Sequence, residues 1–143
     1  TGFCCTIEMK LKNENDAATI FTVDNFGENI IVKFSEPDSL VKYSVEQKND
    51  EIIHYYDGVP YLTDNKEDFS SQNRAVSFVY KIKKIINEGQ GKFEDNLLIL
   101  SLSEAGCEWE AAFDKNTNCL MYFNEQTSDS YIKYTAKEFE FKG

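Results

Sequence analysis

The sequence is poor in several residue types that carry recognisable chemistry. Among 143 residues it has one histidine, one tryptophan, two prolines and a single arginine, Arg74. Arginine is preferred for bidentate clamps on phosphate or carboxylate, so a site built from such clamps is not expected. The sole histidine, His54, reads as a half-exposed strand residue, because no motif places a nucleophile and an orienting carboxylate near it. The cysteines follow neither a zinc-binding nor a C-x-x-C spacing: they are Cys4, Cys5, Cys107 and Cys119.

Long apolar runs and positive charge are also scarce. No apolar run exceeds about six residues, far short of the length that spans a bilayer. The 15 Lys and Arg face 25 Asp and Glu, for a formal charge of -10. Nucleic acid or an anionic membrane surface would repel such a chain. Phosphate-binding loops, calcium loops and serine-hydrolase elbows are absent, so the sequence predicts neither a cofactor nor a metal site.

The apolar content indicates a folded domain. Hydrophobic residues make up 41% and aromatic residues 14%, which is enough for one core over residues 1–143 and is unlike a disordered segment. Glu108 and Glu110 flank Trp109 with the spacing of one strand face, and a solvated face is the ordinary interpretation of that pattern. An enzyme of cystatin-like or related α+β fold is therefore the weakest of three hypotheses for function.

Period-two alternation dominates the chain and predicts strands with one buried face. Pro37 ends one of them, because proline cannot donate to a ladder. A polar turn is expected at 13–16, and hairpin turns at 25–28 and 48–50. The predicted strands are 3–11, 19–23, 30–34, 41–45, 52–56, 97–103, 107–113, 119–123 and 131–141.

One segment has helical spacing instead. Apolar residues recur through 75–87, which predicts one amphipathic helix capped by Ser70 or Ser71 and ended by Gly89. The order of elements predicts an α+β fold. In it, the amphipathic helix covers one side of a strongly curved antiparallel sheet.

The hairpin of 107–113 and 119–123 concentrates large apolar side chains. If Phe113 faces Cys119, then Trp109, Met121 and Phe123 share the face of Phe113, while Leu120 lies on the other. Such stripes are usually core. Their bulk also leaves open a groove that the helix covers only in part.

Several segments resemble LolA/LolB-like lipoproteins, in particular uncharacterised Gram-positive members of that superfamily. The resemblance lies in the strand-turn-strand-proline segment 21–37, the stretch 52–58 that ends in Tyr-Asp-Gly, and the amphipathic helix. It continues in 108–114, 119–123 and the final strand ending in 139–141. Together these segments cover most of the chain.

The resemblance implies that the curved sheet is an unclosed half-barrel with the amphipathic helix packed across its concave face. It also implies a non-catalytic, extracytoplasmic domain tethered at the bacterial cell surface. Its membrane contact would be an N-terminal lipid anchor, and we expect this sequence to begin after that anchor. Related proteins bind acyl chains of lipoproteins or glycolipids, or sense envelope stress. The first hypothesis is thus a lipid, acyl chain or lipopeptide held on the concave face. The second is an envelope protein-interaction or sensor domain whose interior is fully packed. Candidate ligand-binding residues are Trp109, Phe113, Met121, Phe123, Phe34 and Phe78.

Overall fold

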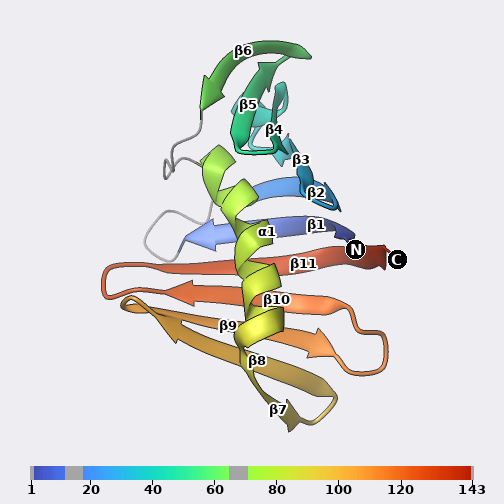
Figure 1. Cartoon of the computed structure of the whole chain (residues 1–143), viewed down its shortest axis with the longest axis vertical. Helices are drawn as coiled ribbons and strands as arrows, with labels where there is room; N and C mark the ends of the chain where they lie inside the picture. The colour runs from blue at the N-terminus through green and yellow to red at the C-terminus, as the bar shows by residue number, and fades with distance from the viewer. Residues whose placement is uncertain (1, 12–17, 65–70, 143) are drawn as a thin grey trace.

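The protein folds as one sheet with one helix laid across it. The computed structural model describes residues 2–11, 18–64 and 71–142. In these ranges eleven strands form a single sheet in which every neighbouring pair is antiparallel, and one α-helix crosses it (Figure 1). The chain is therefore mostly β, and the α+β description fits only coarsely.

The strands before the helix are β1 (Gly2–Leu11), β2 (Thr19–Phe26), β3 (Asn29–Glu36), β4 (Tyr43–Lys48), β5 (Glu51–Tyr56) and β6 (Val59–Asp64), with a short 3-10 helix η1 (Asp38–Leu40). After the helix α1 (Ser71–Glu88) come β7 (Gln90–Glu94), β8 (Leu97–Glu104), β9 (Cys107–Asp114), β10 (Leu120–Gln126) and β11 (Tyr131–Lys142). The nine predicted strands are confirmed with shifted bounds, whereas β6 and β7 were not predicted. The turn expected at 13–16 and the helix caps at Ser70 or Ser71 lie outside the described residues and side chains.

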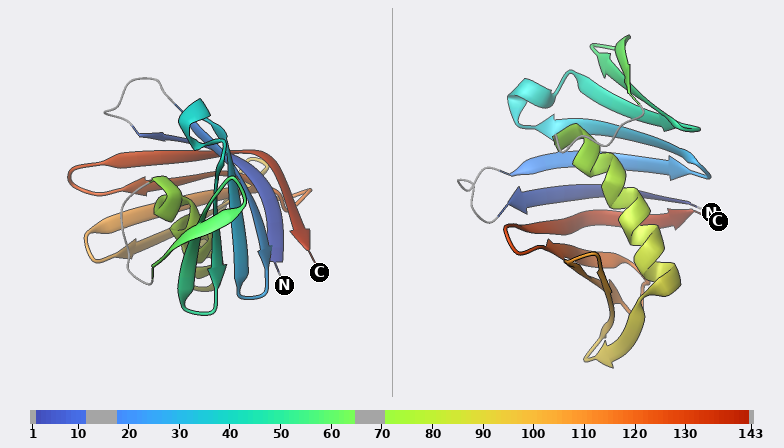
Figure 2. Two further views of the ribbon diagram at one scale, coloured as in Figure 1. Left: turned by 90° about the horizontal axis from the view of Figure 1, so that it is seen from above. Right: turned by 60° about the vertical axis from the view of Figure 1, so that its left-hand side comes forward.

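The two halves of the chain meet in the middle of the sheet. Strand order is β6-β5-β4-β3-β2-β1-β11-β10-β9-β8-β7, and Gly2 of β1 lies opposite Lys142 of β11. The helix joins the two outermost strands, β6 and β7, so it must run diagonally across the whole sheet. Figure 2 shows the sheet curling around the helix, with β6 and β7 at opposite edges. The sheet is thus curved and unclosed.

Burial alternation explains why the helix lies on the concave face. On β1, Phe3, Cys5, Ile7 and Met9 are buried and point to the same side as the helix. The helix in turn buries its stripe of Val76, Phe78, Val79, Ile82 and Ile85, while Tyr80 faces solvent. Apolar residues recur with period 2 along the strands and with period 3.6 along the helix, so each element presents one apolar face and the two faces pack against each other.

Gly89 ends the helix as predicted. Its N–H donates to the Ile85 carbonyl oxygen at 2.8 Å, and a Cβ at this position would lie only 2.5 Å from the same oxygen. Glycine therefore allows the close approach that turns the chain into β7.

Candidate functional site: the concave face of the sheet

Four of the six candidate ligand-binding residues lie in the core beneath or beside the helix. The exposed fractions of Phe34, Phe78, Phe113 and Phe123 are 4%, 0%, 6% and 0%. Trp109 is partly buried and packs against the same core. Trp109 lines part of a hollow of about 450 Å³, and two others of about 430 and 510 Å³ lie elsewhere; none of the three is lined by these four phenylalanines.

Met121 does not join them, which corrects the predicted hairpin register. Phe113 pairs with Leu120 rather than with Cys119, and a bulge follows between Leu120 and Tyr122. The extra residue turns Met121 outward, where it is 44% exposed, and turns Leu120 inward. A pairing of Phe113 with Cys119 would place Glu125 opposite Cys107, whereas Glu125 lies opposite Trp109.

The centre of the covered face is an aromatic cluster around Phe78 of α1. Its ring stacks on Tyr134 of β11 with centroids 5.0 Å apart, and meets Phe123 of β10 edge-on at 5.9 Å and Phe21 of β2 at 6.2 Å. Trp109 extends the cluster through Phe123 at 6.4 Å. One helix side chain thus contacts strands from both halves of the sheet.

A polar strip accompanies the aromatic cluster. The Lys81 ammonium of α1 lies 2.5 Å from Glu125 Oε2 of β10, and only 23% and 11% of these two side chains are exposed. Cys107 Sγ lies 3.8 Å from the same carboxylate oxygen and accepts a hydrogen bond from Trp109 Nε1 at 2.8 Å. Burial raises the pKa of the Cys107 thiol, so the group stays protonated and lacks the character of an activated nucleophile.

The area that the helix buries decides whether it can act as a lid. Its five large apolar side chains (Val76, Phe78, Val79, Ile82 and Ile85) are 0–2% exposed. Burying each of these side chains contributes about 1.5–3 kcal/mol, so exposing all five would cost at most roughly 8–15 kcal/mol. That is comparable to the whole stability of an ordinary domain. The helix therefore belongs to the core.

Beyond the helix, the concave face of β4–β6 is open and rich in tyrosine. Tyr43 meets Tyr56 at 5.5 Å and Tyr61 at 5.9 Å between ring centroids, and these three residues are named here the tyrosine patch. Tyr56 and Tyr61 are 48% and 51% exposed. Burial of the hydroxyl and its hydrogen bond with Tyr43 raise the pKa of Tyr61 to about 12.

His54 lies beside the tyrosine patch, 6.3 Å from Tyr61 between ring centroids. It is buried rather than half exposed, which corrects the sequence-based expectation. It faces inward because it pairs with Val45 of β4, whose side chain is part of the core.

The segment that carries the tyrosine patch is rich in carboxylates, although alternation places Glu46, which accepts a hydrogen bond from Tyr55, on the other face of the sheet. Residues 43–64, which contain β4 to β6, carry five carboxylates against one lysine. Among the described residues no group of three or more His, Cys, Asp or Glu side chains is arranged to hold a metal ion. The negative charge is thus spread along the strands and turns.

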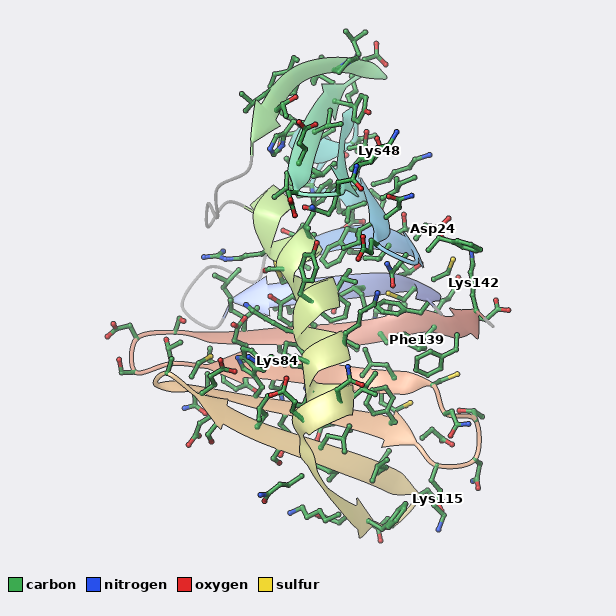
Figure 3. All side chains as sticks on the ribbon, in the orientation of Figure 1. Asp24, Lys48, Lys84, Lys115, Phe139 and Lys142 are labelled. Atoms are coloured by element: carbon green, nitrogen blue, oxygen red, sulfur yellow. The ribbon has the colours of Figure 1, made fainter. Side chains whose placement is uncertain are left out.

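A separate polar cluster lies on the convex face, at the end of the sheet where β1 begins and β11 ends. Asp24 Oδ1 accepts from Cys4 Sγ at 3.3 Å and pairs with Lys142 Nζ at 3.1 Å, as Figure 3 shows for the two labelled charged residues. The hydrogen bond from Lys142, followed by that from Cys4, lowers the pKa of Asp24. The cluster ties β1, β2 and β11 together.

Sequence reasoning missed the tyrosine patch because it missed β6. Pro60 and the Asp57-Gly58 turn interrupt the alternation there, and Val59 and Leu62 are exposed like Tyr61. The available signal was compositional: five of the eight tyrosines lie at 43, 55, 56, 61 and 80.

Comparison with known proteins shows the fold alone. No protein-family model matches the sequence, and a search of curated proteins gives no match. Among solved structures, an uncharacterized conserved protein from Thermus thermophilus is similar, with a TM-score of 0.58 at 14% sequence identity. The similarity covers 100% of this chain and 80% of that one. No helix in the described ranges has the length and apolarity to cross a membrane.

Proposed function

We propose that this protein is a non-catalytic binding domain that holds a segment of a partner protein on the tyrosine patch. The observation that carries the proposal is the exposure of Tyr56 and Tyr61 on a concave surface that the helix leaves uncovered. Tyrosine is enriched at protein interfaces because it offers a large apolar ring and a polar tip at small entropic cost.

The shape of the surface favours a protein partner over an acyl chain. Lipid-like ligands are held in cavities that enclose most of their surface. The residues expected to line such a cavity, Phe34, Phe78, Phe113 and Phe123, are packed against helix and sheet instead. The tyrosine patch is an open strip of rings that suits an extended or helical segment lying on it.

The charge around the patch defines the partner further. Residues 43–64 carry five carboxylates and one lysine, and although Glu46 lies on the opposite face, the net negative charge of this end of the sheet favours a segment that carries Lys or Arg beside its apolar side chains. Tyrosine faces also attract such cations directly. An extracytoplasmic location and a lipid anchor belong to the proposal through the family resemblance alone.

A peptide library displayed on phage and selected against the whole chain tests the proposal. Selected peptides should carry Lys or Arg with aromatic or aliphatic residues, and should lose about tenfold or more in affinity for the Tyr56→Ser and Tyr61→Ser variants. Phe26→Ser, which removes an exposed ring of β2 outside the tyrosine patch, is the matched control and should bind normally. Binders that ignore both tyrosine substitutions would contradict the proposal.

Native mass spectrometry of the gently purified protein tests the acyl-chain hypothesis in parallel. The proposal expects a mass of 16.5 kDa without adduct. A stoichiometric adduct that releases a fatty acid or glycolipid would instead favour a lipid carrier or sensor.

A further inference from the structure

The two free edges of the sheet differ in their capacity to accept another strand. At the β6 edge, Pro60 has no N–H to donate, and the register with β5 shifts between His54 and Tyr55. Both features disfavour strand addition. At the β7 edge there is neither proline nor bulge, and β7 pairs regularly with β8 from Gln90 to Glu94. Within the described ranges, no strand pairs with the outer side of β7.

Strand β7 exposes a large apolar side chain at this open edge. All five of its residues are exposed, and Phe93 is 72% exposed. Lys92 Nζ and Glu94 Oε2 lie 3.5 Å apart on the opposite face of the strand, with about two thirds of each side chain in solvent. Short charged edge strands ordinarily resist pairing with unrelated strands. The order Lys-Phe-Glu, however, places a positive and a negative charge symmetrically about Phe93, so an antiparallel copy of the same strand would carry complementary charges.

We propose that β7 pairs antiparallel with β7 of a second copy of this chain, centred on Phe93. In that register Lys92 of each copy lies opposite Glu94 of the other, so two cross-strand ion pairs form by symmetry. Phe93 lies opposite Phe93 of the second copy, which covers the exposed rings. Opposite charges and aromatic pairs are the cross-strand contacts that stabilise antiparallel strands. The sequence of β7 is therefore complementary to itself.

The pairing is closed by its own symmetry. The same patch serves on both copies, so the contact is isologous and uses up both β7 edges. The remaining β6 edges carry Pro60, and the assembly stops at two copies rather than growing into a fibre. In this register only Lys92 to Glu94 overlap, because Gln90 and Gly91 face turn residues of the second copy. So short an overlap buries less surface than permanent dimers do, so the dimer is weak and concentration dependent. The inference is independent of the proposed function, because the tyrosine patch lies at the other edge.

Sedimentation equilibrium between about 10 µM and 1 mM tests the inference, since weak interfaces fall in this range of dissociation constants. The wild-type mass should rise from 16.5 kDa toward twice that value with concentration. Lys92→Glu and Glu94→Lys should each weaken association about tenfold or more, because each places like charges opposite one another twice. The double variant Lys92→Glu/Glu94→Lys restores opposite charges and should associate like the wild type.

Two further variants separate the edge from general surface effects. Phe93→Ser should weaken association, whereas Val59→Ser, an exposed apolar residue of β6, should leave it unchanged. Circular dichroism should show all variants folded, because every altered side chain is exposed. A wild type that stays monomeric at 1 mM, single charge variants that associate normally, or a double variant that is not restored would each overturn the inference.

Discussion

The Phe78 ring of α1 stacks on the Tyr134 ring of β11, with centroids 5.0 Å apart and planes inclined by 29°. Both residues are fully buried. Strand β11 is central, paired with β1 on one side and β10 on the other. This stack therefore fastens the helix to the middle of the sheet, where the two halves of the chain meet, and makes the covered concave face part of the core.

Removing the Phe78 ring should destabilise the protein strongly. Phe78→Ala should lower the free energy of unfolding by about 3–5 kcal/mol, because a buried aromatic ring is lost and a cavity remains. Tyr80→Ala, which truncates an exposed ring two residues along the same helix, should cost under about 1 kcal/mol. Urea denaturation of both variants measures the difference, and equal midpoints would show that the helix is not packed as described.

The β10 bulge predicts opposite outcomes for two adjacent residues of similar size. Leu120→Ala should cost about 2–5 kcal/mol, because Leu120 is buried, whereas Met121→Ala should cost under about 1 kcal/mol. Denaturant midpoints decide between this register and regular alternation from Phe113. Regular alternation would reverse the order of the two effects.

The ion pair between Lys81 and Glu125 should contribute more to the free energy of unfolding than the ion pair that Lys84 forms on the same helix. Lys81→Met leaves the largely buried Glu125 carboxylate without its cation, and should cost about 1–3 kcal/mol. Lys84→Met breaks the more exposed pair with Glu104 and should cost under about 1 kcal/mol. A double-mutant cycle for each pair gives the coupling energies, and similar values would contradict the burial of the first pair.

Tyr122 should report on alkaline stability. Burial, together with its hydrogen bond to the Glu110 carboxylate at 2.9 Å, raises the pKa of Tyr122 to about 12. Folding thus favours the neutral phenol. This contribution to stability is complete below pH about 10, the unfolded pKa, and is lost as pH rises toward 12. Absorbance at 295 nm should show late titration in the wild type, and Tyr122→Phe should reduce its amplitude by one phenol, because the pKa of Tyr61 is also raised to about 12. Glu110→Gln should lower the pKa of Tyr122, because it removes the negative charge beside the phenol. An unchanged titration of Tyr122 in this variant would refute the hydrogen bond between Tyr122 and Glu110.

Burial governs how much of this fold the sequence predicts. The strands of the sheet interior, such as β1 with Ile7 and Met9, alternate strongly because one face meets the helix. Strands β6 and β7 lie at the edges, where residues such as Leu62 and Phe93 stay exposed and leave no alternation to detect.

The candidate site was predictable only in part, for a similar reason. Phe34, Phe78, Phe113 and Phe123 lie in the core on the inner face, but a stripe of apolar residues has the same pattern whether it lines a groove or fills a core. Only the tertiary position of the helix decides. The bulge that reverses Leu120 and Met121 depends on pairing between strands and leaves no mark in the local pattern.

Hydrogen exchange of the whole native chain, followed by mass spectrometry across a urea series, tests most directly whether the helix is core or lid. The account predicts that amides of α1 from Val76 to Ile85 exchange only by global unfolding, with the same opening free energy as those of β1 and β11. An α1 that opens several kcal/mol below the central strands would contradict the account. The covered aromatic face would then be accessible to a ligand.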